Sequence, residues 1–241
     1  MSAPRFHVAE AAPGAHLELP EHSAHHARDV LRLRAGDDVR VFDGRGAEYA
    51  AALDQVSRKR VTVRLAGLVV PRPESPLLMT LALSPLKGDR MELVVQKATE
   101  LGVSAIHPVI LTRTDAVARP ALKGTRQDRW EKVASGAAEQ CGRATVPEIH
   151  PARLLGEWLR EELPQKRLVF CEGKPPLGSA GWGPALVLLV GPAGGIEESE
   201  LLLLRDHGFE ERGLGPRTLR AETAAIAAVC ALQLLAGDLG R

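Results

Sequence analysis

The chain has 241 residues with a formal net charge of +1; 45% are hydrophobic, so it can bury a sizeable core and has room for two domains. No uncharged stretch reaches the length of a membrane span and no apolar segment follows the first residues, so we expect a cytoplasmic protein with no membrane partner. The spacing of Cys141, Cys171 and Cys230 indicates neither a disulfide framework nor a metal site.

The first part of the chain has the pattern of short strands. Val39 and Val41 flank Arg40, and Asp43-Gly44 is a turn signal. Apolar and polar residues then alternate through 61–65. We therefore predict a small β-rich domain over residues 1–72.

A proline-rich segment, 71–76, marks a change in pattern. Beyond it, apolar runs alternate with helical patterns, in the order 77–83, 91–101, 106–111, 130–141, 168–171, 185–190, 201–204 and 224–235. Strands that alternate with helices favour a largely parallel sheet covered on both faces. We therefore predict an α/β domain over residues 73–241.

Two glycine-marked loops near the C-terminus predict a cofactor pocket. Gly191-Pro-Ala-Gly-Gly195 follows an apolar run, and 214–224 (LGPRTLRAETA) runs into a helix. Glycines let two backbones approach one flat ligand. Glu197, Glu198 and Glu200 would repel a phosphate, and neither glycine-rich nucleotide fingerprint is present in this region, so a ligand without phosphate is favoured.

Several basic side chains in the first 72 residues could contact phosphates. Arg58, Arg60 and Arg64 are expected on the polar face of one strand. Arg28 and Arg32 stand at i,i+4, the spacing of one helix face, in a segment that begins at His25. A solvated surface is the competing explanation for the strand arginines.

Taken in order, these motifs resemble the RsmE-like 16S ribosomal RNA (uracil-N3) methyltransferase family of the SPOUT superfamily. The resemblance runs nearly end to end. The motifs that carry it are 25–36 (HHARDVLRLRAG), 41–44 (VFDG), 96–103 (QKATELGV), 138–143 (AEQCGR) with Val146-Pro147, 190–195 (VGPAGG) and 214–224 (LGPRTLRAETA).

The resemblance implies an α/β protein with an N-terminal PUA-like β-barrel that binds RNA and a C-terminal SPOUT-type domain containing a trefoil knot. It also implies a homodimer. The glycine loops become walls of an S-adenosylmethionine site. The residues expected to bind this cofactor are Leu189, Val190, Gly191, Pro192, Gly194, Gly195, Ile196, Leu214, Gly215, Leu219, Arg220 and Thr223. The expected RNA contacts are His25, Arg28, Arg32, Arg58, Arg60 and Arg64.

Methylation at uracil N3 requires loss of the imide proton and stabilisation of charge on the ring carbonyls. Arg220 is the first candidate for charge stabilisation, with an ion pair to Glu222 or to a carboxylate of a partner chain as its alternative role. Glu139 is the candidate base and Arg143 is a candidate to face RNA or a partner's active site; an intrahelical salt bridge between them also explains their spacing. For Thr223, helix capping competes with a direct role.

Two positions depart from the family pattern. Ala193 stands where the family usually has glutamate, and Thr112 stands where an acidic residue often precedes the arginine, here Arg113. We expect activity to survive, because backbone groups of the loop can hold the cofactor.

The prediction is N3 methylation of a 16S ribosomal RNA uridine in the decoding region of assembled 30S subunits. The alternatives are a catalytically silent RNA-binding or ribosome-assembly protein, a related methyltransferase with another target and, third, a dinucleotide enzyme.

Overall fold

The computed structural model describes residues 3–116, 126–178 and 181–240. The chain divides into two compact units. The first is Met1–Glu74 with Ser135–Val146, and the second is Ser75–Ala134 with Pro147–Arg241. The division at 72/73 stays a prediction, and no sequence signal assigned Ser135–Val146 to the earlier part of the chain. No helix within the described ranges is long and apolar enough to cross a membrane.

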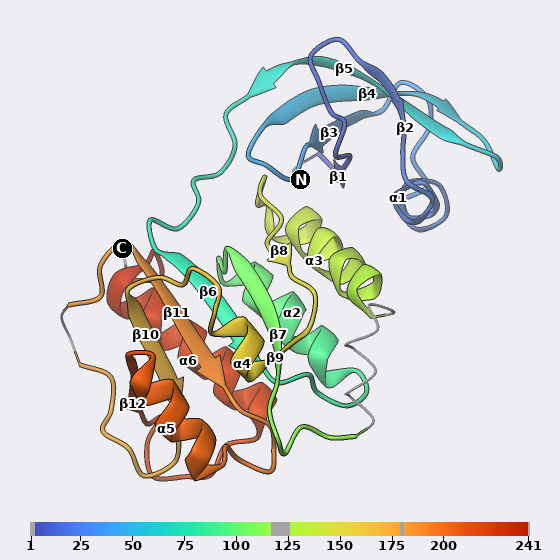
Figure 1. Cartoon of the computed structure of the whole chain (residues 1–241). Coiled ribbons are helices and arrows are strands. Elements are labelled where there is room, and N and C mark those ends of the chain that lie inside the picture. Colours follow the sequence, from blue (N-terminus) through green and yellow to red (C-terminus); the bar gives the residue numbers. More distant parts are fainter. Residues whose placement is uncertain (1–2, 117–125, 179–180, 241) are drawn as a thin grey trace. The chain divides into compact units, whose positions relative to one another are not determined.

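The first unit contains a five-stranded sheet in the order β1-β3-β4-β5-β2 (Figure 1). Its strands are β1 Arg5–His7, β2 His16–Glu18, β3 Asp38–Phe42, β4 Glu48–Val56 and β5 Val61–Val69. The strands predicted at 39–41 and 61–65 are confirmed. Their apolar residues, among them Val39, Val41 and Val63, are fully or almost fully buried, because alternate side chains of a strand point to one face. A short helix, α1 (Glu21–His25), continues as a π-helical turn over His26–Val30.

Arg5 anchors residues 135–146 within this unit. Its guanidinium is bidentate on Glu48, with Nε–Oε1 and Nη2–Oε2 distances of 3.1 and 3.2 Å. It also donates to the carbonyl oxygens of Ala138 at 3.0 Å and Arg143 at 2.9 Å. The Arg5 and Glu48 side chains are only 10% and 3% exposed. A paired, fully hydrogen-bonded charge of this kind costs far less to bury than an isolated one.

The second unit is built on a parallel sheet in the order β12-β10-β11-β6-β7-β8, with β9 also paired to β7. The strands are β6 Leu78–Leu83, β7 Ala105–Ile110, β8 Glu148–Ile149, β9 Arg153–Leu154, β10 Lys166–Phe170, β11 Ala185–Val190 and β12 Phe209–Arg212. Residues 186–189 of β11 are completely buried, as expected for a central strand covered on both faces.

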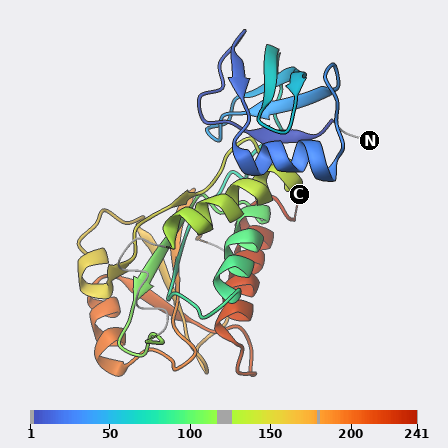
Figure 2. The ribbon, with the colours of Figure 1, turned by 90° about the vertical axis from the view of Figure 1, so that its right-hand side faces the viewer.

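Helices cover both faces of this sheet. They are α2 Arg90–Glu100, α4 Leu155–Trp158, α5 Glu198–Asp206 and α6 Ala221–Ala236. A further helix, α3 Gln127–Cys141, begins in the second unit and continues into the first. Figure 2 shows α2 beside α6 on one face, with α4 and α5 on the opposite face. Trp158, Leu204 and Phe209 belong to the core on the α4 and α5 side. The alternation of strands and helices predicted after the proline-rich segment is confirmed, but β8, β9, α4 and β12 have no counterpart in the prediction.

Candidate active site

A cavity of about 500 Å³ lies at the carboxyl ends of β10, β11 and β12. Loops at this edge of an open parallel sheet are the usual place for a ligand, and the volume is ordinary for a small-molecule site. The walls come from three loops and the start of α6, all in the second unit. They include Phe170, Cys171, Glu172, Lys174, Val190–Ile196, Glu198, Leu214, Gly215, Arg217–Leu219, Ala221 and Ala224.

The loop after β11 turns back on itself. A Cβ added to Gly191 would stand 2.5 Å from Cγ1 of Ile196, so only glycine lets the Ile196 side chain fold over this position. Gly195 has φ of 79°, in the left-handed region that favours glycine, and its N–H donates to the Pro192 carbonyl at 2.9 Å. The backbone of this loop therefore forms one wall of the cavity.

The loop after β12 lies directly against the loop after β10. A Cβ on Gly213 would collide with the carbonyl oxygen of Lys174, and the Gly213 N–H donates to the Pro175 carbonyl at 2.8 Å. Gly215 then adopts φ of 93° and redirects the chain toward α6. This close approach joins the loop after β10 to the loop after β12, which form the second and third walls of the cavity.

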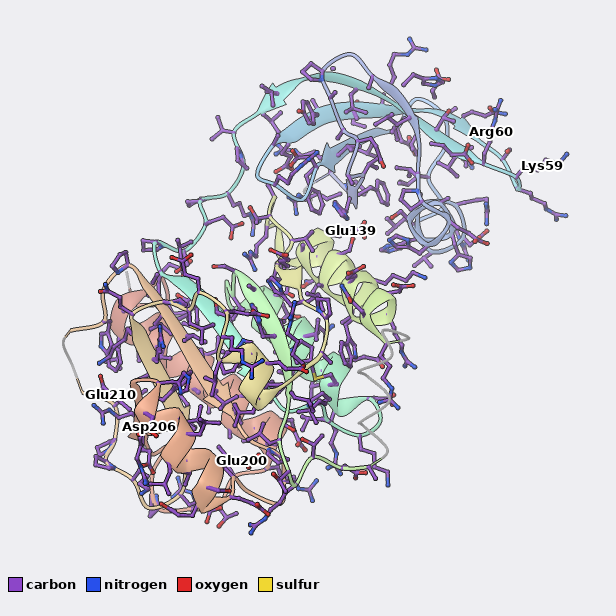
Figure 3. All side chains as sticks on the ribbon, in the orientation of Figure 1. Lys59, Arg60, Glu139, Glu200, Asp206 and Glu210 are labelled. Carbon is purple, nitrogen blue, oxygen red and sulfur yellow. The ribbon has the colours of Figure 1, made fainter. Side chains whose placement is uncertain are left out.

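Residues after β7 form hydrogen bonds and an ion pair that stabilise the loop after β11, the first wall of the cavity. Arg113 donates from Nη1 to the Gly194 carbonyl at 3.0 Å and lies 3.4 Å from the Glu197 carboxylate. The Thr112 N–H and hydroxyl both donate to Oε1 of Glu200, at 2.7 and 3.0 Å. Glu200 also accepts the Glu197 N–H at 3.1 Å through Oε2. The sequence suggested Glu200 only as a charge that repels phosphate. The residue, labelled in Figure 3, is 9% exposed, and its carboxylate links the loop to the segment after β7.

Most residues expected to bind cofactor line this cavity, and three do not. Leu189 is completely buried in the core. Arg220 and Thr223 are exposed at the start of α6, outside the lining. The expected residues in the lining are Val190, Gly191, Pro192, Gly194, Gly195, Ile196, Leu214, Gly215 and Leu219. Ala193 also lines the cavity.

Cys171 is the only thiol in the cavity lining. Burial raises its pKa to about 11, so the group stays a neutral thiol at physiological pH and is a poor nucleophile. Across the described ranges, no group of three His, Cys, Asp or Glu side chains is arranged to hold a metal ion.

Arg220 has the N-cap position of α6, but its side chain makes no capping bond. Of the two alternative partners considered for it, Glu222 does not form the ion pair, and a carboxylate of a partner chain stays a prediction. Glu222 lies instead 3.7 Å from Nε of Arg90. Among the described residues, the Arg220 guanidinium has no ion-pair partner, so it can interact with a ligand.

Glu139 and Arg143 do not form the expected intrahelical salt bridge, because α3 ends at Cys141 and Arg143 lies beyond it. Arg143 pairs with Glu74, 2.7 Å from Nη2. The Glu139 carboxylate accepts the His7 N–H at 2.9 Å and the Ser23 hydroxyl at 3.1 Å. Burial raises the pKa of Glu139.

Glu139 lines a second cavity, of about 740 Å³, that lies wholly within the first unit. Arginine and histidine side chains share this lining with the carboxylates of Glu48 and Glu139. The basic residues are Arg5, His22, His26, Arg40 and Arg72. These basic residues are not the ones that the sequence predicted as RNA contacts, which lie elsewhere in the first unit.

The expectation of a helical face through Arg28 and Arg32 is wrong. The π-helical turn ends at Val30, and Arg32 has φ of 56°, which no helix accommodates. Arg28 pairs with Asp29 at 2.6 Å, and His25 lies 3.6 Å from the same carboxylate.

The expectation of three arginines on one strand face is also wrong. β5 begins at Val61, so Arg58 and Arg60 lie in the hairpin between β4 and β5, at the tip labelled in Figure 3. The Ser57 hydroxyl closes this turn by donating to the Arg60 carbonyl at 3.0 Å. Arg64 alone is on β5, where it pairs with Asp54 at 2.5 Å.

Comparison with known proteins connects both units to RNA modification. The family model described as an RNA methyltransferase domain matches residues 73–233, and a model described as an RNA methyltransferase PUA domain matches residues 19–66. The chain is 30% identical to the ribosomal RNA small subunit methyltransferase E of Bacillus subtilis, over 89% of this chain and 90% of that protein.

Two solved structures are similar over almost their whole length. One is a ribosomal RNA small subunit methyltransferase E from Neisseria gonorrhoeae bound to S-adenosyl methionine, with 36% identity and a TM-score of 0.89 over 99% of this chain and 100% of that one. The other is a Legionella pneumophila protein in complex with the bound cofactor SAM, with 36% identity and a TM-score of 0.90 over the same shares.

Proposed function

Because this chain belongs to the ribosomal RNA small subunit methyltransferase E family, we propose that it methylates N3 of one uridine in 16S ribosomal RNA, with S-adenosylmethionine as methyl donor. The supporting observation is the cavity between two glycine loops at the carboxyl ends of three parallel strands. The substrate is the assembled 30S subunit, because a base must be presented unpaired before its N3 can be reached. Such a substrate puts the protein in the cytoplasm.

The residues of the cavity fit this donor. Ile196, Leu214 and Leu219 offer apolar surface to the adenine ring, and the backbone of 191–195 offers amides and carbonyls to its edge. Charged side chains at the rim suit the polar end of the molecule. When bound, S-adenosylmethionine supplies an electrophilic methyl group. Cofactor contacts are therefore assigned to the nine expected residues that line the cavity, whereas Leu189 and Thr223 would act from behind it.

Arg220 stabilises the charge that uracil acquires when N3 loses its proton. Its guanidinium is exposed at the start of α6, the helix that supplies Ala221 and Ala224 to the cavity, and it has no ion-pair partner among the described residues. A free guanidinium can donate hydrogen bonds to a carbonyl oxygen that gains negative charge. Arg143 and Glu139 remain candidates for RNA contact and proton transfer, although each already has partners in the first unit.

RNA is contacted by the first unit, which serves as a PUA-like barrel. Arg58 and Arg60 at the hairpin tip, and Arg32, have no carboxylate partner in the described part of the chain, so they are the stronger candidates for phosphate contacts. His25, Arg28 and Arg64 already face Asp29 or Asp54 and would have to exchange that partner for a phosphate.

The functional form is a homodimer. The exposed side of α6 carries Cys230, Leu234 and Leu235, and Leu234 is 61% exposed. Glu222 is the one charged residue in this 16-residue helix. An apolar helix face of this kind suits a second copy of the same chain, and here it continues from residues that line the cavity. The trefoil knot implied by the family resemblance belongs to the same proposal.

The 30S requirement can be tested directly. The full-length protein is incubated with methyl-labelled S-adenosylmethionine and either 30S subunits that lack the modification or deproteinised 16S RNA. We expect label in the particle and little in free RNA. Equal labelling of both would contradict the assembled-particle substrate, and cofactor binding with no transfer would favour a silent RNA-binding protein, for which Ala193 would be the first position to examine.

A further inference from the structure

Four charged side chains line the cavity of the second unit: Glu172, Lys174, Glu198 and Arg217. Two of them already have partners. The Lys174 ammonium lies 2.7 Å from Oε2 of Glu211, which raises the pKa of Lys174 by a hydrogen bond. The Glu198 carboxylate accepts a hydrogen bond from Arg205 at 2.9 Å. The charges of Lys174 and Glu198 are therefore already paired with groups that do not line the cavity.

Glu172 and Arg217 are different. Neither has a hydrogen-bond or ion-pair partner for its side chain in the described ranges, and both are exposed to solvent at the cavity. Glu172 follows β10, and Arg217 lies in the loop between β12 and α6. The contact of Gly213 with Lys174 brings these two loops together. The cavity thus presents one available anion and one available cation on two adjoining walls.

We propose that Arg217 and Glu172 form the subsite for the amino-acid end of S-adenosylmethionine, with Arg217 binding the α-carboxylate and Glu172 the α-ammonium. The inference rests on the proposed cofactor and extends it to Glu172, which lies outside the quoted motifs, and to Arg217, which lies within 214–224 but had no assigned role. The amino-acid end is a zwitterion, so it needs one donor-rich cation and one acceptor-rich anion. A guanidinium suits a carboxylate because two parallel N–H groups match its two oxygens.

Two adenosine derivatives separate this subsite from the rest of the pocket. S-adenosylhomocysteine carries the amino-acid end, and 5′-methylthioadenosine lacks it but keeps adenine, ribose and sulfur. Binding of each to the full chain is measured by calorimetry. In the unsubstituted protein we expect tighter binding of S-adenosylhomocysteine. Arg217→Ala should weaken S-adenosylhomocysteine binding by about 10- to 100-fold, as for loss of a charged hydrogen bond, and leave methylthioadenosine unchanged.

Glu172→Gln should weaken the same ligand selectively, because the amide cannot balance the ammonium charge. Arg160→Ala and Glu162→Gln are matched controls, since both residues are exposed in the second unit and neither lines the cavity. Unchanged affinity for methylthioadenosine in each variant shows that the pocket is still folded.

The possible failures are distinguishable. If Arg217→Ala or Glu172→Gln weakens both ligands equally, or neither, the subsite is wrong although the cofactor assignment stands. Equal loss in Glu172→Gln would point to the ribose hydroxyls instead of the ammonium. If the unsubstituted protein binds neither S-adenosylhomocysteine nor S-adenosylmethionine, the proposed function fails and this inference fails with it.

Discussion

Glu200 connects the cofactor loop to the sheet, and its removal should loosen that loop. Glu200 is 9% exposed, and its carboxylate accepts three hydrogen bonds, two from Thr112 and one from the Glu197 N–H. Glu200→Ala removes all three bonds and leaves two backbone N–H groups without this acceptor. Since an unsatisfied buried group costs about 1–3 kcal/mol, we expect a loss of about 3 kcal/mol in the free energy of unfolding of the second unit. Water that reaches the freed N–H groups would reduce this loss in the free energy of unfolding.

The glutamine variant gives a graded comparison. Glu200→Gln keeps one oxygen that can accept both Thr112 bonds, so we expect a loss of only about 1 kcal/mol. The assay is urea unfolding of the full chain, followed by tryptophan fluorescence because Trp158 lies in the core on the α5 side. Affinity for S-adenosylhomocysteine, measured on the same samples, should fall with stability.

Glu162→Ala is the control, because Glu162 is exposed and has no partner among the described residues. A loss below about 1 kcal/mol for Glu200→Ala, with unchanged cofactor affinity, would refute the claim that this carboxylate holds the loop.

Four other predictions follow from the described contacts. Burial lowers the pKa of His107 to about 4, below its ordinary 6.5, and Nδ1 accepts a hydrogen bond from Trp158 at 3.1 Å; the neutral form is therefore favoured in the folded state. The contribution of neutral His107 to the free energy of unfolding is complete above about pH 6.5 and is lost, by up to about 3 kcal/mol, as the pH falls toward 4. The free energy of unfolding of His107→Phe, measured by denaturant unfolding, should therefore depend less on pH over this range. Arg5→Ala should cost about 3 kcal/mol, because the buried Glu48 carboxylate keeps only the longer contact to Arg40, at 3.4 Å, as an ion pair among the described residues. Arg5→Ala with Glu48→Ala together should cost less than the sum of the single changes in urea unfolding. Arg220→Ala should lower the turnover of 30S methylation by at least about tenfold while cofactor affinity by calorimetry stays unchanged; a change confined to affinity would contradict its role. Ala193→Glu should alter turnover by less than about tenfold, since the loop acts through its backbone; a larger gain in single-turnover rate would show that the side chain at this position takes part in the reaction.

The main elements could be predicted from sequence because their patterns are strong. β11 is a continuous apolar run, β6 and β7 are each interrupted by one polar residue, Thr80 and His107, and all three belong to the buried sheet. The glycine loops 191–195 and 214–224 could also be predicted, and the close approach at Gly191 explains the glycine there. Gly213, which meets the Lys174 carbonyl, lies just before the second predicted loop. By contrast, β12 reads Phe-Glu-Glu-Arg and has no apolar pattern, because it is an edge strand whose charged side chains pair with Lys166, Lys174 and Arg205.

The partners of individual side chains were harder to predict. Arg143 and Glu139 stand four residues apart, yet Glu74 and Ser23 compete for them from distant parts of the chain. Spacing along one helix cannot reveal such partners, because they depend on tertiary packing. The roles of Glu200 and Arg217 were missed for the same reason. Only the assembled loops show which charges already have partners and which can still bind a ligand.

The central claim is methylation of uracil N3, and the direct measurement is mass analysis of the product nucleoside. 30S subunits that lack the modification are incubated with the protein and S-adenosylmethionine, and their RNA is digested and compared with synthetic methylated nucleosides. The account predicts N3-methyluridine, close to one per 16S RNA, at a single position. A methyl group on ribose or another base, or no methylated product from a protein that binds the cofactor, would contradict it.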